Sequence, residues 1–253
     1  MSSGESTTWG SESEISNRKP ASVGKNKLAR WAELGTFSNV FQPQGDEVKN
    51  KDHPLRGKWR QNFFRNKNPL VVELGCGKGE YTTGLSQKFP SNNYIGVDIK
   101  GARMWRGAKT AGEQGLHNTA FIRTRIEFIS SFFDSGEVDE IWLTFPDPHP
   151  GKKNANKRLT CPWFLNIYRN ILKDKGIIHL KTDNDELFLY TRSLAEVNGL
   201  NILKSSTDIH QEMPGDEIIK IQTHYEKLFL REGSKINYLE FRLDKNKEIL
   251  PLF

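Results

Sequence analysis

Short apolar runs alternate along the chain with longer segments that have helical spacing. The first run, residues 70–74, is a largely apolar stretch that ends at Gly75, which is typical of a buried strand. Six further strands are predicted at residues 93–99, 119–124, 140–145, 176–181, 201–205 and 236–243, and helices at 79–89, 102–114, 126–133, 162–172 and 185–197. This alternation predicts an α/β fold with a mostly parallel sheet that is covered by helices on both faces. The last two strands flank a long polar connection.

Composition along the chain divides it into three parts. Residues 1–23 are rich in Ser, Thr, Gly and Glu, and we expect a disordered tail because they bury too little apolar surface. Residues 24–68 combine basic side chains with apolar anchors, which predicts a basic arm laid on a core. Trp59 and Phe63 are expected to be core anchors of that arm. Residues 69–253 form the predicted main domain.

Composition narrows the class of protein. The 253 residues include 37 Lys and Arg against 31 Asp and Glu, a net charge of +6, and only two cysteines. These figures exclude a collagen, a disulfide scaffold and a mostly disordered chain, and they suggest a reducing compartment. Neither a membrane span nor a secretory signal is apparent, so we expect a cytoplasmic protein. The positive charge makes a polyanion a plausible partner, although an ordinary solubility charge explains it equally well.

The first strand is followed by a glycine-rich turn, residues 73–79. Alternate glycines, among them Gly75 and Gly77, let the backbone turn sharply and let a ligand approach closely. The dinucleotide fingerprint requires a glycine where Glu80 stands, and the Walker loop is absent, so a nicotinamide cofactor or a nucleoside triphosphate is disfavoured. Asp98 ends the second strand, where an acidic residue can accept hydrogen bonds from ribose hydroxyls, or can cap the next helix. Together the two features predict an adenosine-type site.

A second polar cluster follows the fourth strand. Pro146 and Pro148 fix the backbone on both sides of Asp147 and so hold its carboxylate in place. Such a turn alone is typical of many proteins, but the cations Lys152, Lys153, Lys157 and Arg158 follow at once. We expect these cations, and the basic arm, to contact the phosphates of a nucleic acid. No metal site is predicted, because the six histidines are scattered.

Seven ordered motifs resemble the tRNA (guanine-N7-)-methyltransferase family, a group of class I S-adenosylmethionine-dependent methyltransferases. They are GKNKL at 24–28, ELGCGKG at 73–79, GVDIK at 96–100, FPDPxP at 145–150, KRLT at 157–160, LKTDN at 180–184 and TxYE at 223–226. The resemblance covers residues 24 to about 243. It implies a Rossmann-like fold with a seven-stranded sheet and a C-terminal antiparallel strand. It also implies transfer of a methyl group from S-adenosyl-L-methionine to N7 of a guanine in the tRNA variable loop.

The resemblance also assigns roles by position. It implies that Glu73 and Asp98 bind the cofactor beside Gly75 and Gly77. Glu127 takes a third cofactor position, although it also fits an ordinary surface glutamate. On the acceptor side the matching residues are Asp147, which is the catalytic candidate, Asp183, Thr223 and Glu226.

Two residues depart from the family pattern. Many members carry Trp where His149 stands and Lys where Gly151 stands. Lys152 or Lys153 is a candidate replacement for that lysine. His149 is expected to stack on a base or to cap its loop. Two other functions stay open: a small-molecule methyltransferase would not need the basic segments, and a non-catalytic RNA-binding protein would not need the intact acidic positions. The residues do not distinguish a monomer from a homodimer.

Overall fold

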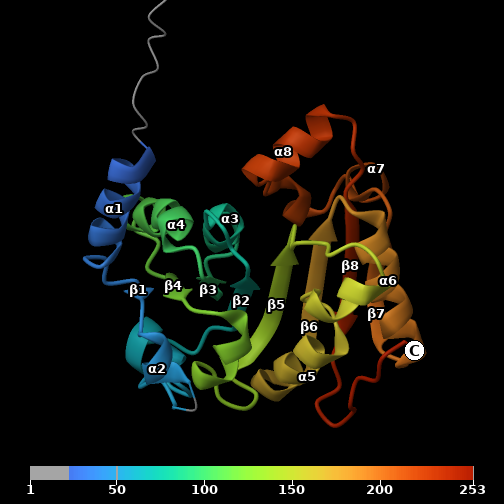
Figure 1. The fold of residues 1–253 in the computed structure, drawn as a ribbon, viewed down its shortest axis with the longest axis horizontal. Helices are drawn as coiled ribbons and strands as arrows, with labels where there is room; N and C mark the ends of the chain where they lie inside the picture. Colours follow the sequence, from blue (N-terminus) through green and yellow to red (C-terminus); the bar gives the residue numbers. More distant parts are fainter. Residues whose placement is uncertain (1–22, 50, 253) are drawn as a thin grey trace, which may run out of the picture.

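The computed structural model describes residues 23–49 and 51–252 and builds them around one eight-stranded sheet (Figure 1). The expected tail therefore lies outside the described residues except for Val23. The strands stand in the order β1-β4-β3-β2-β5-β6-β8-β7. They are β1 Val40–Phe41, β2 Leu70–Leu74, β3 Asn93–Asp98, β4 Thr119–Arg123, β5 Val138–Thr144, β6 Leu172–Thr182, β7 Asn201–Ser206 and β8 Asn237–Arg242.

Strands β1 to β6 pair in parallel, and β8 runs antiparallel to both β6 and β7. The α/β class and the C-terminal antiparallel strand are therefore confirmed. The predicted count of seven strands is corrected to eight, because the arm contributes β1. That strand has two residues and pairs Val40 with Phe121 on β4, and two residues are too few to show an alternating pattern.

The α-helices in the described part of the chain are α1 Val23–Leu34, α2 Gly45–Val48, α3 Glu80–Lys88, α4 Gly101–Glu113, α5 Pro162–Ile171, α6 Asp185–Val197, α7 Ile209–Glu212 and α8 His224–Arg231. Helices α3 to α6 lie close to their predicted positions, and the helix predicted at 126–133 is a 3-10 helix. The sequence pattern does not predict α1, α2, α7 or α8. A π-helix spans Trp59–Phe64, and 3-10 helices span Ile126–Ser131, Lys152–Lys157 and Glu217–Lys220. The predicted polar connection is thus largely helical. No helix in the described part of the chain is long and apolar enough to cross a membrane.

The alternation of side chains along β2 shows how the sheet is buried on both faces. Leu70, Val72 and Leu74 belong to the core cluster that includes residues of α5 and α6, whereas Val71 packs with Tyr81 of α3. All these side chains are almost fully buried, and each contributes about 1.5–3 kcal/mol of transfer free energy. The sheet is therefore the middle layer of three.

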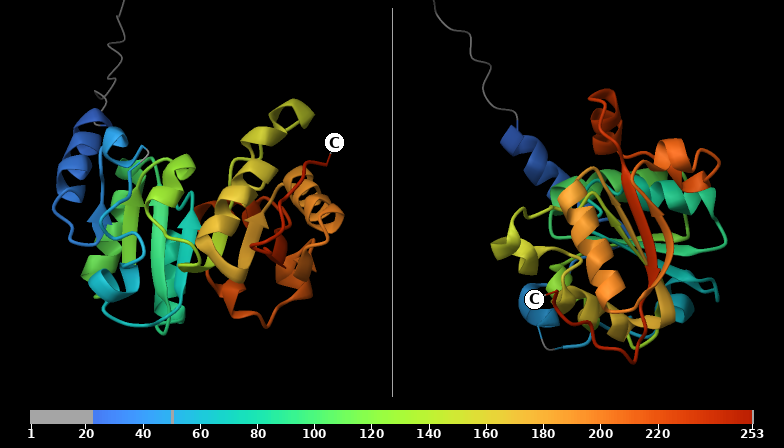
Figure 2. Two further views of the ribbon diagram at one scale, coloured as in Figure 1. Left: turned by 90° about the horizontal axis from the view of Figure 1, so that it is seen from below. Right: turned by 90° about the vertical axis from the view of Figure 1, so that its right-hand side faces the viewer.

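The basic arm contacts both faces of this sheet. Helix α1 packs against α4 on one face, and the π-helix packs on the opposite face, where Trp59 is fully buried. The indole Nε1 of Trp59 donates a hydrogen bond to the carbonyl of Phe132 at 2.8 Å. Figure 2 shows the arm at the opposite end of the sheet from the C-terminal strands. Trp59 is thus a core anchor, as predicted.

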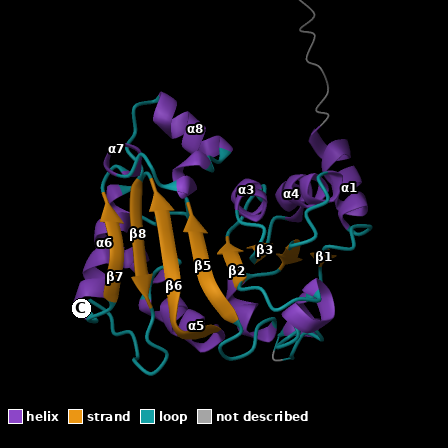
Figure 3. Ribbon diagram, turned by 180° about the vertical axis from the view of Figure 1, so that it is seen from behind, coloured by secondary structure: helices purple, strands orange, loops and turns teal. Residues whose placement is uncertain are grey.

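The strand order locates the crevice in which such sheets bind ligands. From β2 the chain moves through β3 to β4, and it then returns to place β5 on the other side of β2. Ligands bind outside the carboxyl ends of parallel strands at this kind of reversal. Figure 3 shows α3 and α8 on either side of the space beyond the end of β5. The fold thus directs the ends of β2, β3, β5 and β6 toward one site.

Candidate active site

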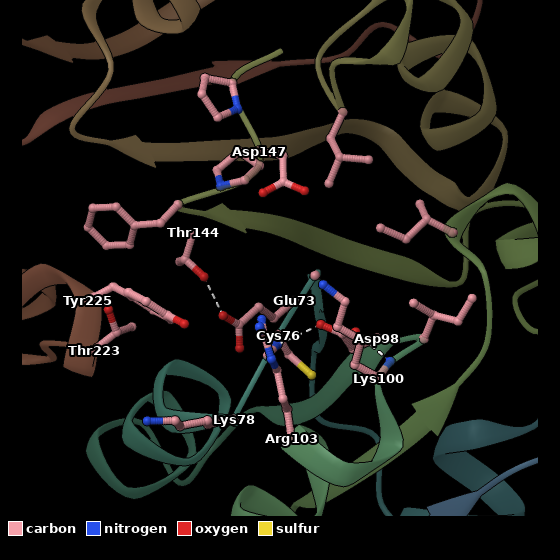
Figure 4. Close-up of a pocket in the computed structure, with 18 of the residues that line it drawn as sticks. Glu73, Cys76, Lys78, Asp98, Lys100, Arg103, Thr144, Asp147, Thr223 and Tyr225 are labelled. Atoms are coloured by element: carbon pink, nitrogen blue, oxygen red, sulfur yellow. Dashed lines mark hydrogen bonds between the residues drawn. The ribbon is translucent and has the colours of Figure 1, made fainter.

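A cleft of about 780 Å³ opens at the reversal between β2 and β5 (Figure 4). Its size lies within the usual range for cofactor and substrate sites. Eight of the residues predicted from the sequence line this cleft: Glu73, Gly75, Gly77, Asp98, Glu127, Asp147, Asp183 and Thr223. They come from six separate segments of the chain, so the fold has brought them together.

Glu73 lies at the end of β2 and is 3% exposed. Its carboxylate accepts a hydrogen bond from the backbone N–H of Thr82 at 2.8 Å and further bonds from the hydroxyls of Thr82 and Thr144. Burial raises the pKa of Glu73 to about 7, even though these three hydrogen bonds act in the opposite direction. The side chain is therefore held rigidly at the floor of the cleft and is easily protonated near neutral pH.

Asp98, at the end of β3, ties the glycine turn to the next helix. Its Oδ2 accepts a hydrogen bond from the backbone N–H of Gly77 at 2.9 Å, and its Oδ1 accepts one from the backbone N–H of Lys100 at 2.7 Å. Gly75 and Gly77 have φ angles of 80° and 55°, in the left-handed region that favours glycine. A Cβ atom at Gly77 would meet nothing within 4 Å, so the backbone is open toward the cleft.

These features fit an adenosine-type cofactor. A carboxylate offers about four acceptor positions, so Asp98 keeps two after its backbone bonds. The open glycine backbone lets a ligand approach closely. Glu127 lies farther along the cleft, and its carboxylate pairs with Arg125 at 2.7 Å. Burial acts to raise the pKa of Glu127, but hydrogen bonds from Arg125 and from the backbone of Glu127, together with the charge of Arg125, hold that pKa below its ordinary value.

Asp147 is exposed, and it lies across the cleft from Glu73 and Asp98 (Figure 4). Its loop leaves β5 through Phe145, whose N–H donates to the carbonyl of Lys181 at 2.8 Å. Phe145 and His149 both have left-handed φ angles, 49° and 43°, which is unusual for residues other than glycine. The loop is thus folded tightly around an accessible carboxylate.

The remaining predicted residues fall into two groups. Asp183 and Thr223 line the cleft, and burial raises the pKa of Asp183. Thr223 is also the N-cap of α8, where its hydroxyl accepts the N–H of Glu226 at 3.1 Å. Lys152 and Lys153 are exposed on the 3-10 helix beside the cleft and do not line it.

Glu226 lies beneath the cleft wall and is fully buried. One carboxylate oxygen lies 2.7 Å from Nζ of Lys181 and 3.0 Å from Nε2 of His210. Lys181 is equally buried, and this burial lowers its pKa. The structure therefore does not bring Glu226 to the cleft. Its carboxylate fixes α8 to β6 instead.

Known proteins share both the sequence and the fold. A family model described as "Putative methyltransferase" matches residues 67–239. The tRNA (guanine-N(7)-)-methyltransferase of Christiangramia forsetii is 50% identical over 220 residues, which cover 87% of this chain and 98% of that protein. The enzyme of the same name from Bacteroides fragilis is 47% identical over 227 residues, with 90% and 89% covered. The chain belongs to the tRNA (guanine-N7-)-methyltransferase family.

Solved structures extend the likeness of the fold to other methyltransferases. The 16S rRNA methyltransferase KamB aligns with a TM-score of 0.57 over 77% of this chain and 95% of that one, at 13% identity. A structure described as an antibiotic-related methyltransferase aligns with a TM-score of 0.56 over 78% and 97%, at 17% identity. At these identities the likeness concerns the fold alone.

The cleft of this methyltransferase also contains residues that the sequence analysis did not select. Thr144 binds Glu73, and Lys78 and Arg103 line the cleft near the glycine turn. Lys78 lies inside the glycine motif and Thr144 directly precedes the FPDP motif, so proximity to a motif could have identified both. Arg103 lies in the first turn of α4 and carries no such signal.

Proposed function

We propose that this chain transfers a methyl group from S-adenosyl-L-methionine to N7 of a guanine in the variable loop of tRNA. The observation that carries the proposal is the exposed carboxylate of Asp147, which lies across the cleft from Glu73 and Asp98. The names of relatives that are 44–50% identical support tRNA as the substrate and guanine N7 as the acceptor. The free thiols Cys76 and Cys161 fit a cytoplasmic enzyme.

Glu73, Gly75, Gly77, Asp98 and Glu127 would hold the cofactor. When bound, S-adenosyl-L-methionine supplies an electrophilic methyl group on a sulfonium centre. Asp98 would receive the ribose hydroxyls, and the open backbone of the glycine turn would lie against the ligand. The buried carboxylate of Glu73 would face the amino-acid end, where a neighbouring cation favours its charged form.

Asp147 would orient the acceptor. Guanine N7 carries an in-plane lone pair and no proton, so no base is needed to remove a proton from the nucleophile. The protein must instead align the base and exclude water, which can supply about 7–11 kcal/mol through preorganisation. The carboxylate of Asp147 would hold the N1–H and N2–H edge of the guanine and stabilise the positive charge that develops on the ring.

The other acceptor-side residues would hold the rest of the tRNA. Asp183 and Thr223 line the same cleft as Asp147, which supports contacts to the nucleotide. Lys152 and Lys153 lie on an exposed basic helix next to the cleft, where they would approach backbone phosphates. Glu226 would act through α8, since both its oxygens are engaged inside the protein.

Asp147→Ala tests the proposal. We expect methylation of tRNA to be almost abolished, while the affinity for S-adenosylmethionine in calorimetry stays unchanged. Asp174→Ala is the matched control, because Asp174 is exposed at the far end of β6. Mass spectrometry of nuclease fragments would locate 7-methylguanine in the variable loop. Wild-type-like turnover by Asp147→Ala would refute the role of Asp147, and methylation of a small molecule in place of tRNA would refute the function.

A further inference from the structure

Arg158 is a buried cation at the edge of the active site. It follows the 3-10 helix Lys152–Lys157, and only 2% of it is exposed. Its guanidinium lies over the ring of Tyr190, 4.5 Å from the centroid. A buried charge is costly unless it is paired and hydrogen-bonded. The expectation that this residue contacts phosphate, as its basic neighbours do, is therefore corrected: Arg158 is directed into the protein.

The guanidinium is bonded to the loop that carries Asp147. Its Nε donates to the carbonyl of Pro148 at 3.1 Å and to that of His149 at 3.3 Å, and its Nη2 donates to His149 at 3.2 Å. These two carbonyls belong to the residues that directly follow Asp147. Arg158 therefore fixes the backbone on the C-terminal side of the carboxylate.

A carboxylate from α6, that of Glu186, binds both Arg158 and the end of the loop. We call Arg158 and Glu186 together the clamp. One oxygen of Glu186 accepts a hydrogen bond from Nη2 of Arg158 at 2.6 Å and another from the N–H of Gly151 at 2.9 Å. Gly151 has a φ angle of 82° and marks the end of the loop. The arginine and the end of the loop are thus attached to the same atom of one helix.

The loop needs such a restraint, because its backbone is strained. Phe145 and His149 both adopt left-handed φ angles, which cost roughly 1–2 kcal/mol each for residues with a side chain. Strained conformations persist only where the surrounding structure over-determines them. The bonds from Arg158 reach one of these two residues directly.

We propose that Arg158 is a positioning residue for methyl transfer, which holds Asp147 at the cleft through the carbonyls of Pro148 and His149. The inference rests on the proposed function, since it assigns Arg158 to the same acceptor site. A displacement of about 1 Å in a catalytic group can reduce a rate about 100-fold. The clamp therefore matters for the rate of methylation and not for cofactor affinity.

Arg158→Lys keeps the charge but removes the planar set of donors that binds both carbonyls. We expect kcat for tRNA to fall about 10- to 100-fold, with the KM for tRNA and the affinity for the cofactor nearly unchanged. Arg192→Lys is the matched control, because that arginine is exposed on the same helix as Glu186. The salt dependence of tRNA binding should stay the same, whereas loss of a phosphate contact would lower its slope by about 0.7–0.9.

A double variant tests whether Arg158 acts through Asp147. In an Asp147→Asn background, Arg158→Lys should cause no further loss in single-turnover methylation, because the group being positioned is already disabled. A fully additive loss, an unchanged kcat in the single variant, or a reduced salt slope would overturn the inference. If Arg158→Lys does not fold, Glu186→Ala removes the acceptor that Arg158 and Gly151 share, at a half-exposed side chain, and must lower kcat. An inactive wild type would refute the proposed function itself.

Discussion

The buried pair Lys181–Glu226 allows a stringent test of how the cleft wall is held. Both side chains are fully inaccessible to water, and their charged atoms lie 2.7 Å apart. Glu226→Gln removes the negative charge and one acceptor oxygen, so the ammonium group of Lys181 keeps only neutral partners: the amide oxygen at 226, the carbonyl of Ile221 at 3.4 Å and the ring of Tyr81 at 5.3 Å. Such an uncompensated charge costs about 3–5 kcal/mol.

The expected loss is large enough to measure in two ways. In urea unfolding at neutral pH, Glu226→Gln should lower the free energy of unfolding by about 3–5 kcal/mol. For a chain of this size the melting temperature should fall by roughly 6–20 °C. An exposed pair of similar length, Arg192–Glu196 on α6, is the control, and its Glu196→Gln variant should lose under about 1 kcal/mol.

The double variant Lys181→Met/Glu226→Leu separates the cost of an unpaired charge from the value of the pair. Replacing both partners by apolar groups should be far less harmful than either single change, because no buried charge remains. The double-mutant cycle formed by the two single variants and the double variant should then give a coupling energy of about 2–3 kcal/mol between Lys181 and Glu226. Equal losses in the control and in Glu226→Gln, or additive losses in the double variant, would refute the reasoning.

Two further predictions concern the floor of the cleft. The raised pKa of Glu73, about 7 against an ordinary 4.5, means that the folded state binds this proton more tightly than the unfolded state. The bound proton therefore contributes about 3 kcal/mol to the free energy of unfolding. This contribution is fully present below pH 4.5 and is lost as the pH rises through 7. Urea titrations from pH 5 to 8 should show this decline in the wild type and a flatter profile in Glu73→Gln; parallel profiles would contradict it. Gly79→Ala would place a Cβ atom 2.6 Å from an aromatic ring at a φ angle of 70°, so it should destabilise by more than about 1 kcal/mol. A Cβ atom at Gly112, in helix α4, would meet nothing within 4 Å, so Gly112→Ala should leave the stability of the protein unchanged or raise it by up to about 1 kcal/mol. Thermal melts of the two variants test this, and equal losses of stability in Gly79→Ala and Gly112→Ala would contradict it.

The elements that the sequence predicts well are those with local signals. Helix α6 spans the predicted residues, and its start has a local signal, because Asn184 caps the helix by accepting the N–H of Leu187 at 2.8 Å. The strands of the central sheet are apolar on both faces, so their runs stand out from the polar turns. The acidic residues at their carboxyl ends could be selected for the same reason, since each directly follows such a run.

Burial of charged residues could not be predicted in this way. Glu226 and Arg158 both lie in polar segments that are typical of a surface. Their burial depends on partners far away in the sequence: Lys181 is 45 positions from Glu226, and Glu186 is 28 positions from Arg158. The partners meet only in the folded chain, where Lys181 lies on β6, Glu186 on α6 and Glu226 on α8. A pattern within one segment carries no information about such a pairing.

The positive charge of the chain therefore serves two separate physical purposes. Arg158 and Lys181 lie in an environment of low dielectric constant, where each must have a carboxylate partner, and each fixes a segment that borders the cleft. Lys152 and Lys153 are exposed, where water and salt screen them and where a phosphate can displace counterions. Only the exposed group can contribute to the salt dependence of RNA binding. The net charge of +6 consequently says little about affinity for tRNA until each cation has been assigned to one purpose or the other.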